Sequence, residues 1–253
     1  MNHEERTSIK PYDPDVFDRL NLFRTAKTLL YHNKGYIRNL GDVIVTHQLH
    51  ERFGVCLLHK HFEQYHDEIV VRTIDPERRL AHMRPTSRHT DAVPYLWRAL
   101  HDSRGRLQFV PLEYIRRGDE RESQVTDLEQ YAPFLAAMAH ALAERELLDV
   151  FGIATTNIMS IPVAHDELMV ETTDSENRIL TITPEHRSNL QIEELTETFW
   201  TFLPGPLTDL GEVAFCSGMH CNSHCKNHCI GHCKSHCKDH PDPYSPEDVA
   251  FGP

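Results

Sequence analysis

The chain has 253 residues, a formal net charge of -12 at pH 7 and a hydrophobic content of 40%. This negative charge argues against a broad basic surface, so we expect no nucleic-acid partner. No apolar run approaches the roughly 20 residues of a membrane span, and the first residues lack the apolar core of a secretory signal. We therefore expect a cytoplasmic or nuclear protein whose thiols stay reduced.

Three parts are predicted along the chain. Residues 1–14 are polar and predict a flexible N-terminus, and 15–205 predict an α+β globular domain. Residues 206–253 predict a Cys/His-repeat metal-binding tail, which begins where a Pro-Gly-Pro sequence punctuates the chain at 204–206. The middle part is long enough to bury a sizeable core.

The first half of the domain predicts one helix followed by strands. Apolar residues recur at helical spacing over 16–30. The apolar segments 54–62 and 67–75 predict two strands, and 106–115 predicts a third. The stretch 76–94 is rich in Pro and Arg and is expected to be an irregular connection.

The second half predicts two helices around a hairpin. Residues 133–148 carry an apolar stripe at helical spacing and predict the clearest helix of the chain. Two strands follow, joined around 174–177, and 188–204 is expected to be the last helix, with Ser188 as its N-cap. Helices and hairpins are mixed without a repeating β-α-β order, which predicts an α+β fold.

The tail repeats a His-Cys pair every four residues over 219–240. Thiolate and imidazole together are the ligand set of Zn(II), and thiolate-rich sites also suit Cu(I). We expect Zn(II) as the favoured ion and Cu(I) as the alternative, in about three tetrahedral sites if no ligand is shared. The candidate ligands are Cys216, His220, Cys221, His224, Cys225, His228, Cys229, His232, Cys233, His236, Cys237 and His240.

The conformation of the repeat is left open by the sequence. The segment has too few apolar side chains to order itself. A helix would place Cys221, His224, Cys225 and His228 on one side, whereas an irregular segment would fold back at its glycines. A single straight helix cannot surround an ion, so ligands from another copy of the chain would be needed. Self-association through the tail is therefore an expected partner interaction, beside the metal ions themselves.

A second candidate metal site is formed by His59 and His61. At positions i and i+2 of a strand the two imidazoles project from one face. A third His or a carboxylate would complete an open site able to activate water. The favoured alternative is that both are polar residues on the solvent face of a half-buried strand. Cys56, in the same strand, is expected to be a buried apolar filler.

These patterns predict a metal-binding protein whose tail binds several Zn(II) or Cu(I) ions, for buffering, storage or delivery. One alternative is an assembly in which metal ions join the tails of several chains. A second alternative is a metal-dependent enzyme that uses His59 and His61. The sequence has no Gly-rich phosphate loop, G-x-S-x-G elbow or H-E-x-x-H helix, so the catalytic residues of such an enzyme stay unknown.

Overall fold

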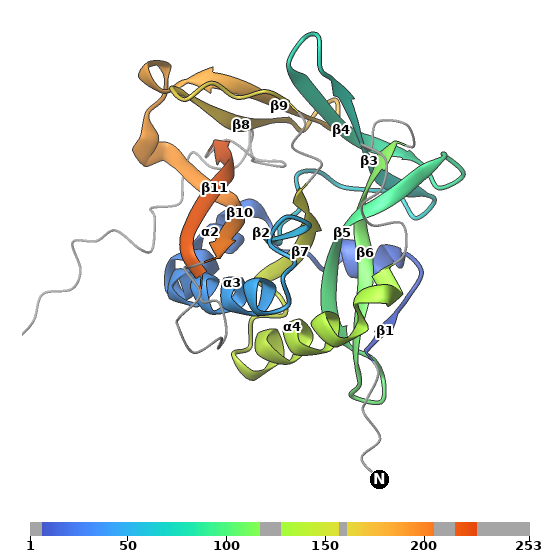
Figure 1. Ribbon diagram of the computed structural model, residues 1–253. Helices are drawn as coiled ribbons and strands as arrows, with labels where there is room; N and C mark the ends of the chain where they lie inside the picture. Colours follow the sequence, from blue (N-terminus) through green and yellow to red (C-terminus); the bar gives the residue numbers. More distant parts are fainter. Residues whose placement is uncertain (1–6, 117–127, 157–160, 205–215, 227–253) are drawn as a thin grey trace, which may run out of the picture.

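The computed structural model describes residues 7–116, 128–156 and 161–204, together with the backbone of 216–226 (Figure 1). Its helices are α1 (Pro14–Asp18), α2 (Phe23–Asn33), α3 (Ile37–Thr46) and α4 (Ala132–Glu144). Its strands are β1 (Ser8–Ile9), β2 (Phe53–Leu57), β3 (Glu68–Asp75), β4 (Leu80–Ser87), β5 (Ala92–His101), β6 (Leu107–Arg116), β7 (Phe151–Thr155), β8 (Glu167–Asp174), β9 (Ile179–His186), β10 (Leu195–Pro204) and β11 (Cys216–Lys226). This is a globular α+β body, as predicted. Among the described residues, no helix has the length and apolar character needed to cross a membrane.

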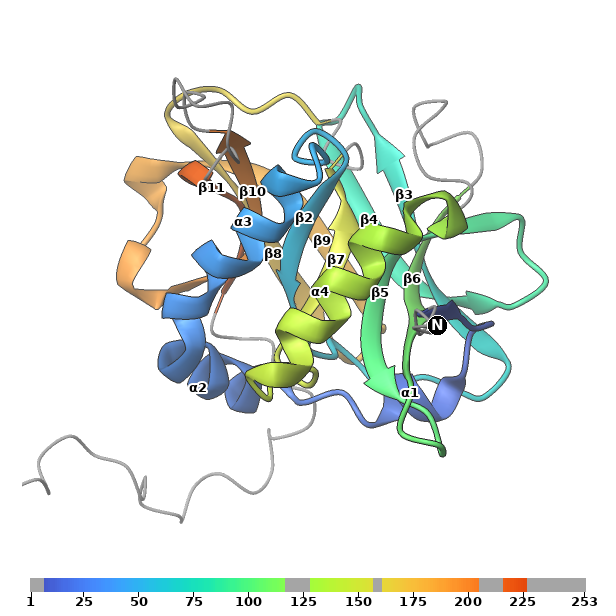
Figure 2. The ribbon, with the colours of Figure 1, turned by 60° about the horizontal axis from the view of Figure 1, so that its bottom comes forward.

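The described strands form one mixed, curved sheet, in the order β1-β6-β3-β4-β9-β8-β11-β10-β2-β7-β5. Strand β5 also pairs with β6 from Ala92 to His101, so the pairing runs round a closed circuit with β1 outside it. Helices α3 and α4 lie side by side against this sheet (Figure 2). Their apolar faces pack on Trp97 and Trp200, which are almost fully buried. The sheet and the helix pair therefore share one hydrophobic core.

The chain contains an internal duplication. The elements α3 and β2 to β6 are followed by α4 and β7 to β11 in the same order. The sequence FG opens both β2 and β7, and the sequence HDE recurs at 66–68 and 165–167, where β3 and β8 begin. Gln48 and Glu146, just after α3 and α4, both have a left-handed backbone, with φ of 58° and 57°. Sequence and backbone thus agree on which residues are equivalent.

The two halves are arranged around a pseudo-twofold axis. Strand β2 pairs antiparallel with its equivalent β7, and β4 pairs antiparallel with its equivalent β9. Arg79, in the turn of the β3–β4 hairpin, forms an ion pair with Glu167 of the second half. Its equivalent Arg178, in the β8–β9 turn, forms the reciprocal ion pair with Glu68, with a nitrogen–oxygen distance of 2.7 Å. The two hairpins lie next to each other at the top of Figure 1.

The helix predicted over 16–30 is two helices, α1 and α2, and helix α3 was not predicted. Two further segments also differ from the sequence prediction. Residues 188–204 do not form a helix, because short 3-10 turns at Arg187–Asn189 and Ile192–Glu194 lead into strand β10. The Thr and aromatic residues of β10 favour an extended chain, and Trp200 is completely buried there. The predicted connection 76–94 contains β4 and the start of β5. Its Pro94 lies at a register shift of β5, where the missing N–H of proline is tolerated.

The first part of the predicted tail is a strand. Cys216–Lys226 forms β11, whose backbone pairs antiparallel with β10 and parallel with β8. For these residues the structure has neither the helix nor the irregular chain that the sequence left open. The rest of the repeat, 227–253, lies outside the described residues. The domain boundary at 205 stays a prediction.

Candidate metal centre

His59 and His61 lie in an extended segment directly after β2, not in the strand itself. Between them, the amide of Lys60 donates to the carbonyl of Asn21 over 3.0 Å, which holds the segment against the chain before α2. The extended backbone places the two imidazoles on one side, with ring centroids 4.4 Å apart. Their exposed fractions are 7% and 8%. The predicted common face is confirmed, and the prediction that it is a solvent face is wrong.

Glu171, in the middle of β8, completes the cluster. Each of Glu171, His59 and His61 is buried and offers one ligand atom, and these atoms lie within 4.8 Å of one another. Ligands at the 2.0–2.1 Å of a tetrahedral zinc site are about 3.3 Å apart, so small side-chain rotations would close the cluster on an ion. The sequence predicted a third His or a carboxylate without naming it. Glu171 was missed because it comes from the other half of the duplication.

Hydrogen bonds orient the ligand atoms of this cluster. The Nδ1 atom of His59 lies 3.0 Å from the carbonyl oxygen of Leu57. A carbonyl oxygen only accepts, so Nδ1 carries the proton and Nε2 keeps a lone pair for a metal. The Oε1 atom of Glu171 accepts a hydrogen bond from the hydroxyl of Thr198 over 3.2 Å. Such outer partners are what fixes imidazole and carboxylate ligands in metal sites, so the residues present fit a divalent ion.

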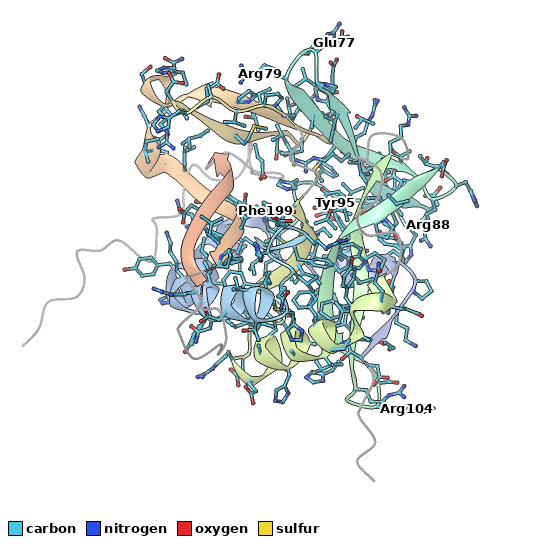
Figure 3. The ribbon with its side chains drawn as sticks, viewed as in Figure 1. Glu77, Arg79, Arg88, Tyr95, Arg104 and Phe199 are labelled. Atoms are coloured by element: carbon cyan, nitrogen blue, oxygen red, sulfur yellow. The ribbon has the colours of Figure 1, made fainter. Side chains whose placement is uncertain are left out.

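The cluster borders a cavity of about 60 Å³ in the interior between the two halves. Several of its lining residues are equivalent pairs of the duplication: Cys56 with Ala154, Arg72 with Glu171, and Met83 with Ile182. The cavity therefore lies on the pseudo-twofold axis. Two further lining residues, Tyr95 from β5 and Phe199 from β10, lie near the middle of the molecule in Figure 3, far from Arg79 at the hairpin tip.

The polar side chains that line the cavity beside the cluster include Glu113 on β6, Tyr95 on β5 and Arg72 on β3. The Tyr95 hydroxyl donates a hydrogen bond to Glu113. Burial raises the pKa of Glu113, although the charge of His61 and the Tyr95 hydrogen bond act in the opposite direction. Burial and the neighbouring Glu113 charge raise the pKa of Tyr95. The guanidinium carbon of Arg72 lies 5.6 Å from the centroid of the Tyr95 ring. The cavity thus has a polar side facing the His/Glu cluster.

Cys56 on β2 is buried beside the same cavity. Its burial raises the pKa of the thiol well above the ordinary value. The thiol is therefore held in its neutral form, which is a poor nucleophile and a poor metal ligand. The prediction of a buried apolar filler is confirmed.

The predicted ligands of the repeat fall into two groups. The backbone of β11 carries the first group, which is Cys216, His220, Cys221, His224 and Cys225. The second group lies outside the described residues and consists of His228, Cys229, His232, Cys233, His236, Cys237 and His240. In the sheet, Cys225 is in register with Glu171 of the adjacent strand β8. The backbone of the repeat at Cys225 is therefore one strand away from Glu171 of the candidate metal centre.

Comparison of the chain with family models, with curated proteins and with solved structures gave no match. The candidate centre thus rests on its own geometry. That geometry is two imidazoles and one carboxylate, buried together beside a cavity and oriented by hydrogen bonds.

Proposed function

We propose that the body of this protein binds one divalent transition-metal ion through His59, His61 and Glu171. The observation that carries the proposal is the convergence of their ligand atoms in the buried interior, within 4.8 Å of one another. A buried carboxylate and two buried imidazoles are costly to desolvate, and a shared cation offsets that cost. Two of the ligands come from one half of the duplication and the third from the other, so the site forms only when both halves fold together.

Two imidazoles and one carboxylate are the protein ligands of catalytic zinc sites and of non-haem Fe(II) sites. Both kinds of site keep at least one coordination position for water or substrate. The adjoining cavity of about 60 Å³ provides room for such a ligand. A metal-dependent enzyme acting on a small molecule is the function that this arrangement supports best. When bound, the ion would supply Lewis-acid activation of water or of the substrate.

Around that position, the protein supplies an acid–base partner, Glu113, and a cation, Arg72. Glu113 and Tyr95 share a hydrogen bond at the cavity wall. A buried carboxyl group in this place is suited to exchange a proton with a ligand of the ion. Apolar side chains, among them Leu112, Leu180 and Phe199, form the rest of the cavity wall.

The proposal is tested by the metal content of the full chain. Purified protein and its His59→Ala and Glu171→Gln variants are loaded with Zn(II) under reducing conditions, dialysed and analysed by mass spectrometry of the metal. We expect each variant to lose about one ion per chain. His140→Ala is the matched control, because His140 is exposed on α4, where its Nε2 atom lies 3.0 Å from the carboxylate of Glu144. Equal metal content in all four proteins would contradict the proposal.

The Cys/His repeat carries a second candidate function. Its alternating thiols and imidazoles favour several bound Zn(II) ions, with Cu(I) as the alternative, for metal buffering, storage or delivery. The specific observation in its favour is the spacing of the twelve candidate ligands over 216–240. Ions shared between chains would make the repeat an assembly element instead. The strand pairing of Cys225 with Glu171 adds that metal held by the repeat would lie close to the body.

A further inference from the structure

We propose that the cavity binds the carboxylate group of a small organic acid, held between Arg72 and the metal ion. This inference rests on the proposed metal centre and adds the chemical class of its ligand. It starts from Arg72, which is buried with an exposed fraction of 5% and lines the cavity from β3.

Arg72 lacks the contacts that usually satisfy a buried guanidinium. Its Nε atom has no hydrogen-bond partner among the described residues. Its guanidinium carbon lies 5.6 Å from the centroid of the Tyr95 ring, and among the described residues no ion pair joins Arg72 to a carboxylate. Buried arginines are normally paired, because an unpaired buried charge is costly. The guanidinium is therefore a donor directed at a ligand that the cavity receives.

Arg72 lies close to Glu113 without donating a hydrogen bond to it. In the parallel pair of β3 and β6, Val70 is opposite Glu113 and Arg72 is opposite Ile115. Arg72 and Glu113 thus lie diagonally on the same face of the sheet. Their charges interact, but Glu113 is engaged by the Tyr95 hydroxyl. The guanidinium of Arg72 is therefore able to bind a ligand in the cavity.

The balance of charge calls for an anion. Among the described residues, the carboxylates that line the cavity are Glu171 and Glu113, and a bound divalent ion together with Arg72 brings more positive charge than these two can neutralise, even when both are ionised. A buried excess of positive charge is unfavourable, and one anionic ligand removes part or all of it. A planar carboxylate suits both partners, since guanidinium binds it through two parallel hydrogen bonds and the metal accepts oxygen ligands.

The volume of the cavity sets the size of the acid. A water molecule needs about 10–15 Å³ of such space, so about 60 Å³ holds roughly four water-sized groups. Acetate has that size. The duplication supports the same placement, because Arg72 and Glu171 are equivalent residues that face one cavity from opposite halves. At this equivalent position the second half contributes Glu171, which would bind the metal, and the first half contributes Arg72, which would bind the anion.

The test uses the full chain loaded with Mn(II), an ion that prefers nitrogen and oxygen ligands over the thiolates of the repeat. Acetate labelled with ¹³C at its carboxyl carbon is titrated in, and the paramagnetic broadening of its signal reports binding next to the ion. We expect Arg72→Met to weaken acetate binding by at least about tenfold while the Mn(II) content stays at the wild-type level. Arg72→Lys keeps the charge but not the two-pronged geometry, so its binding should be intermediate. Arg84→Met, on the exposed side of β4, is the matched control and should bind acetate like the wild type.

Each outcome decides a different claim. Wild-type protein that binds no Mn(II) would overturn the metal centre itself. Wild-type protein that binds Mn(II) but does not broaden acetate would overturn the carboxylate site alone, and so would an Arg72→Met variant that binds acetate unchanged. Should Arg72→Met fail to fold, the wild-type titration and Arg72→Lys still decide. Labelled bicarbonate is titrated in parallel, and tighter binding of bicarbonate than of acetate would contradict an organic acid as the ligand.

Discussion

Arg72 and Glu171 occupy equivalent positions in the two halves of the chain, and both line the cavity on the pseudo-twofold axis. One is a buried guanidinium and the other a buried carboxylate in the candidate metal centre. His59 and His61 belong to the half that carries Arg72. The polar residues at the axis therefore differ between the halves, while both halves contribute the same kind of ion pair and the same left-handed turn residues.

Helix α3 packs so closely against β10 at Gly41 that adding one methyl group there should destabilise the protein. A Cβ atom at Gly41 would lie 2.2 Å from the ring of Phe202, which is buried on β10. Gly41→Ala should therefore lower the free energy of unfolding by about 1–3 kcal/mol, although alanine favours a helix. Gly35→Ala is the control, because no atom lies within 4 Å of its added Cβ. Urea denaturation compares the two, and equal stability would contradict the close packing at Gly41.

The reciprocal ion pairs predict a loss of stability in acid. Burial tends to raise the pKa of Glu68, but the hydrogen bonds from Arg178 and from the Tyr65 amide outweigh it, so the pKa is lowered in the folded state. A lowered carboxyl pKa contributes stability that is present above the unfolded pKa near 4.5 and is lost as the pH falls through the folded value. Glu68→Gln should cost about 0.5–1 kcal/mol at neutral pH, and this difference from wild type should shrink below pH 4 or so. Urea denaturation at several pH values checks it, and a difference that does not depend on pH would count against the ion pair.

The environment of Cys56 predicts an unreactive thiol. Its pKa is raised by burial, so thiolate is scarce even at mildly alkaline pH. Treatment of the native protein with iodoacetamide at pH 8 or so should leave the peptide containing Cys56 unmodified, whereas treatment in urea should modify it. Mass spectrometry of the peptides measures both. Modification of Cys56 in the native protein would show that the cavity side of β2 is open to reagents.

The repeat predicts a metal load that is independent of the body. Replacing Cys216, Cys221, Cys225, Cys229, Cys233 and Cys237 by Ser in the full chain should remove about three Zn(II) ions per chain and leave the ion at His59, His61 and Glu171. Metal analysis measures the loss. The cysteines are substituted and the repeat is not truncated, because the backbone of β11 belongs to the sheet. The unchanged metal content of the Ser variant would end the proposal for the repeat.

The assembly alternative makes a separate prediction. If metal ions join the repeats of several chains, a chelator should lower the mass of wild-type protein in solution and have no effect on the Ser variant. Light scattering after size-exclusion chromatography measures the mass. An oligomer that persists with chelator would show that metal in the repeat is not what joins the chains.

The sequence predicted the α+β class, helix α4 and the β8–β9 hairpin because each has a strong local pattern. It failed for 188–204, where charged residues at helical spacing hid a strand whose Thr and aromatic side chains are buried by the rest of the sheet. The duplication was present in the sequence, in the recurring FG and HDE, but was not recognised. His59 and His61 were found from their spacing. Glu171 and Arg72 were not, because only the closing of the sheet brings β3 and β8 to one cavity.

The most direct test of the metal centre is a crystal structure of Zn(II)-loaded protein with anomalous data collected at the zinc absorption edge. We predict an anomalous peak bordering the cavity, about 2.0–2.2 Å from one nitrogen each of His59 and His61 and from one carboxylate oxygen of Glu171. Peaks confined to the Cys/His repeat, with none between these three residues, would contradict it.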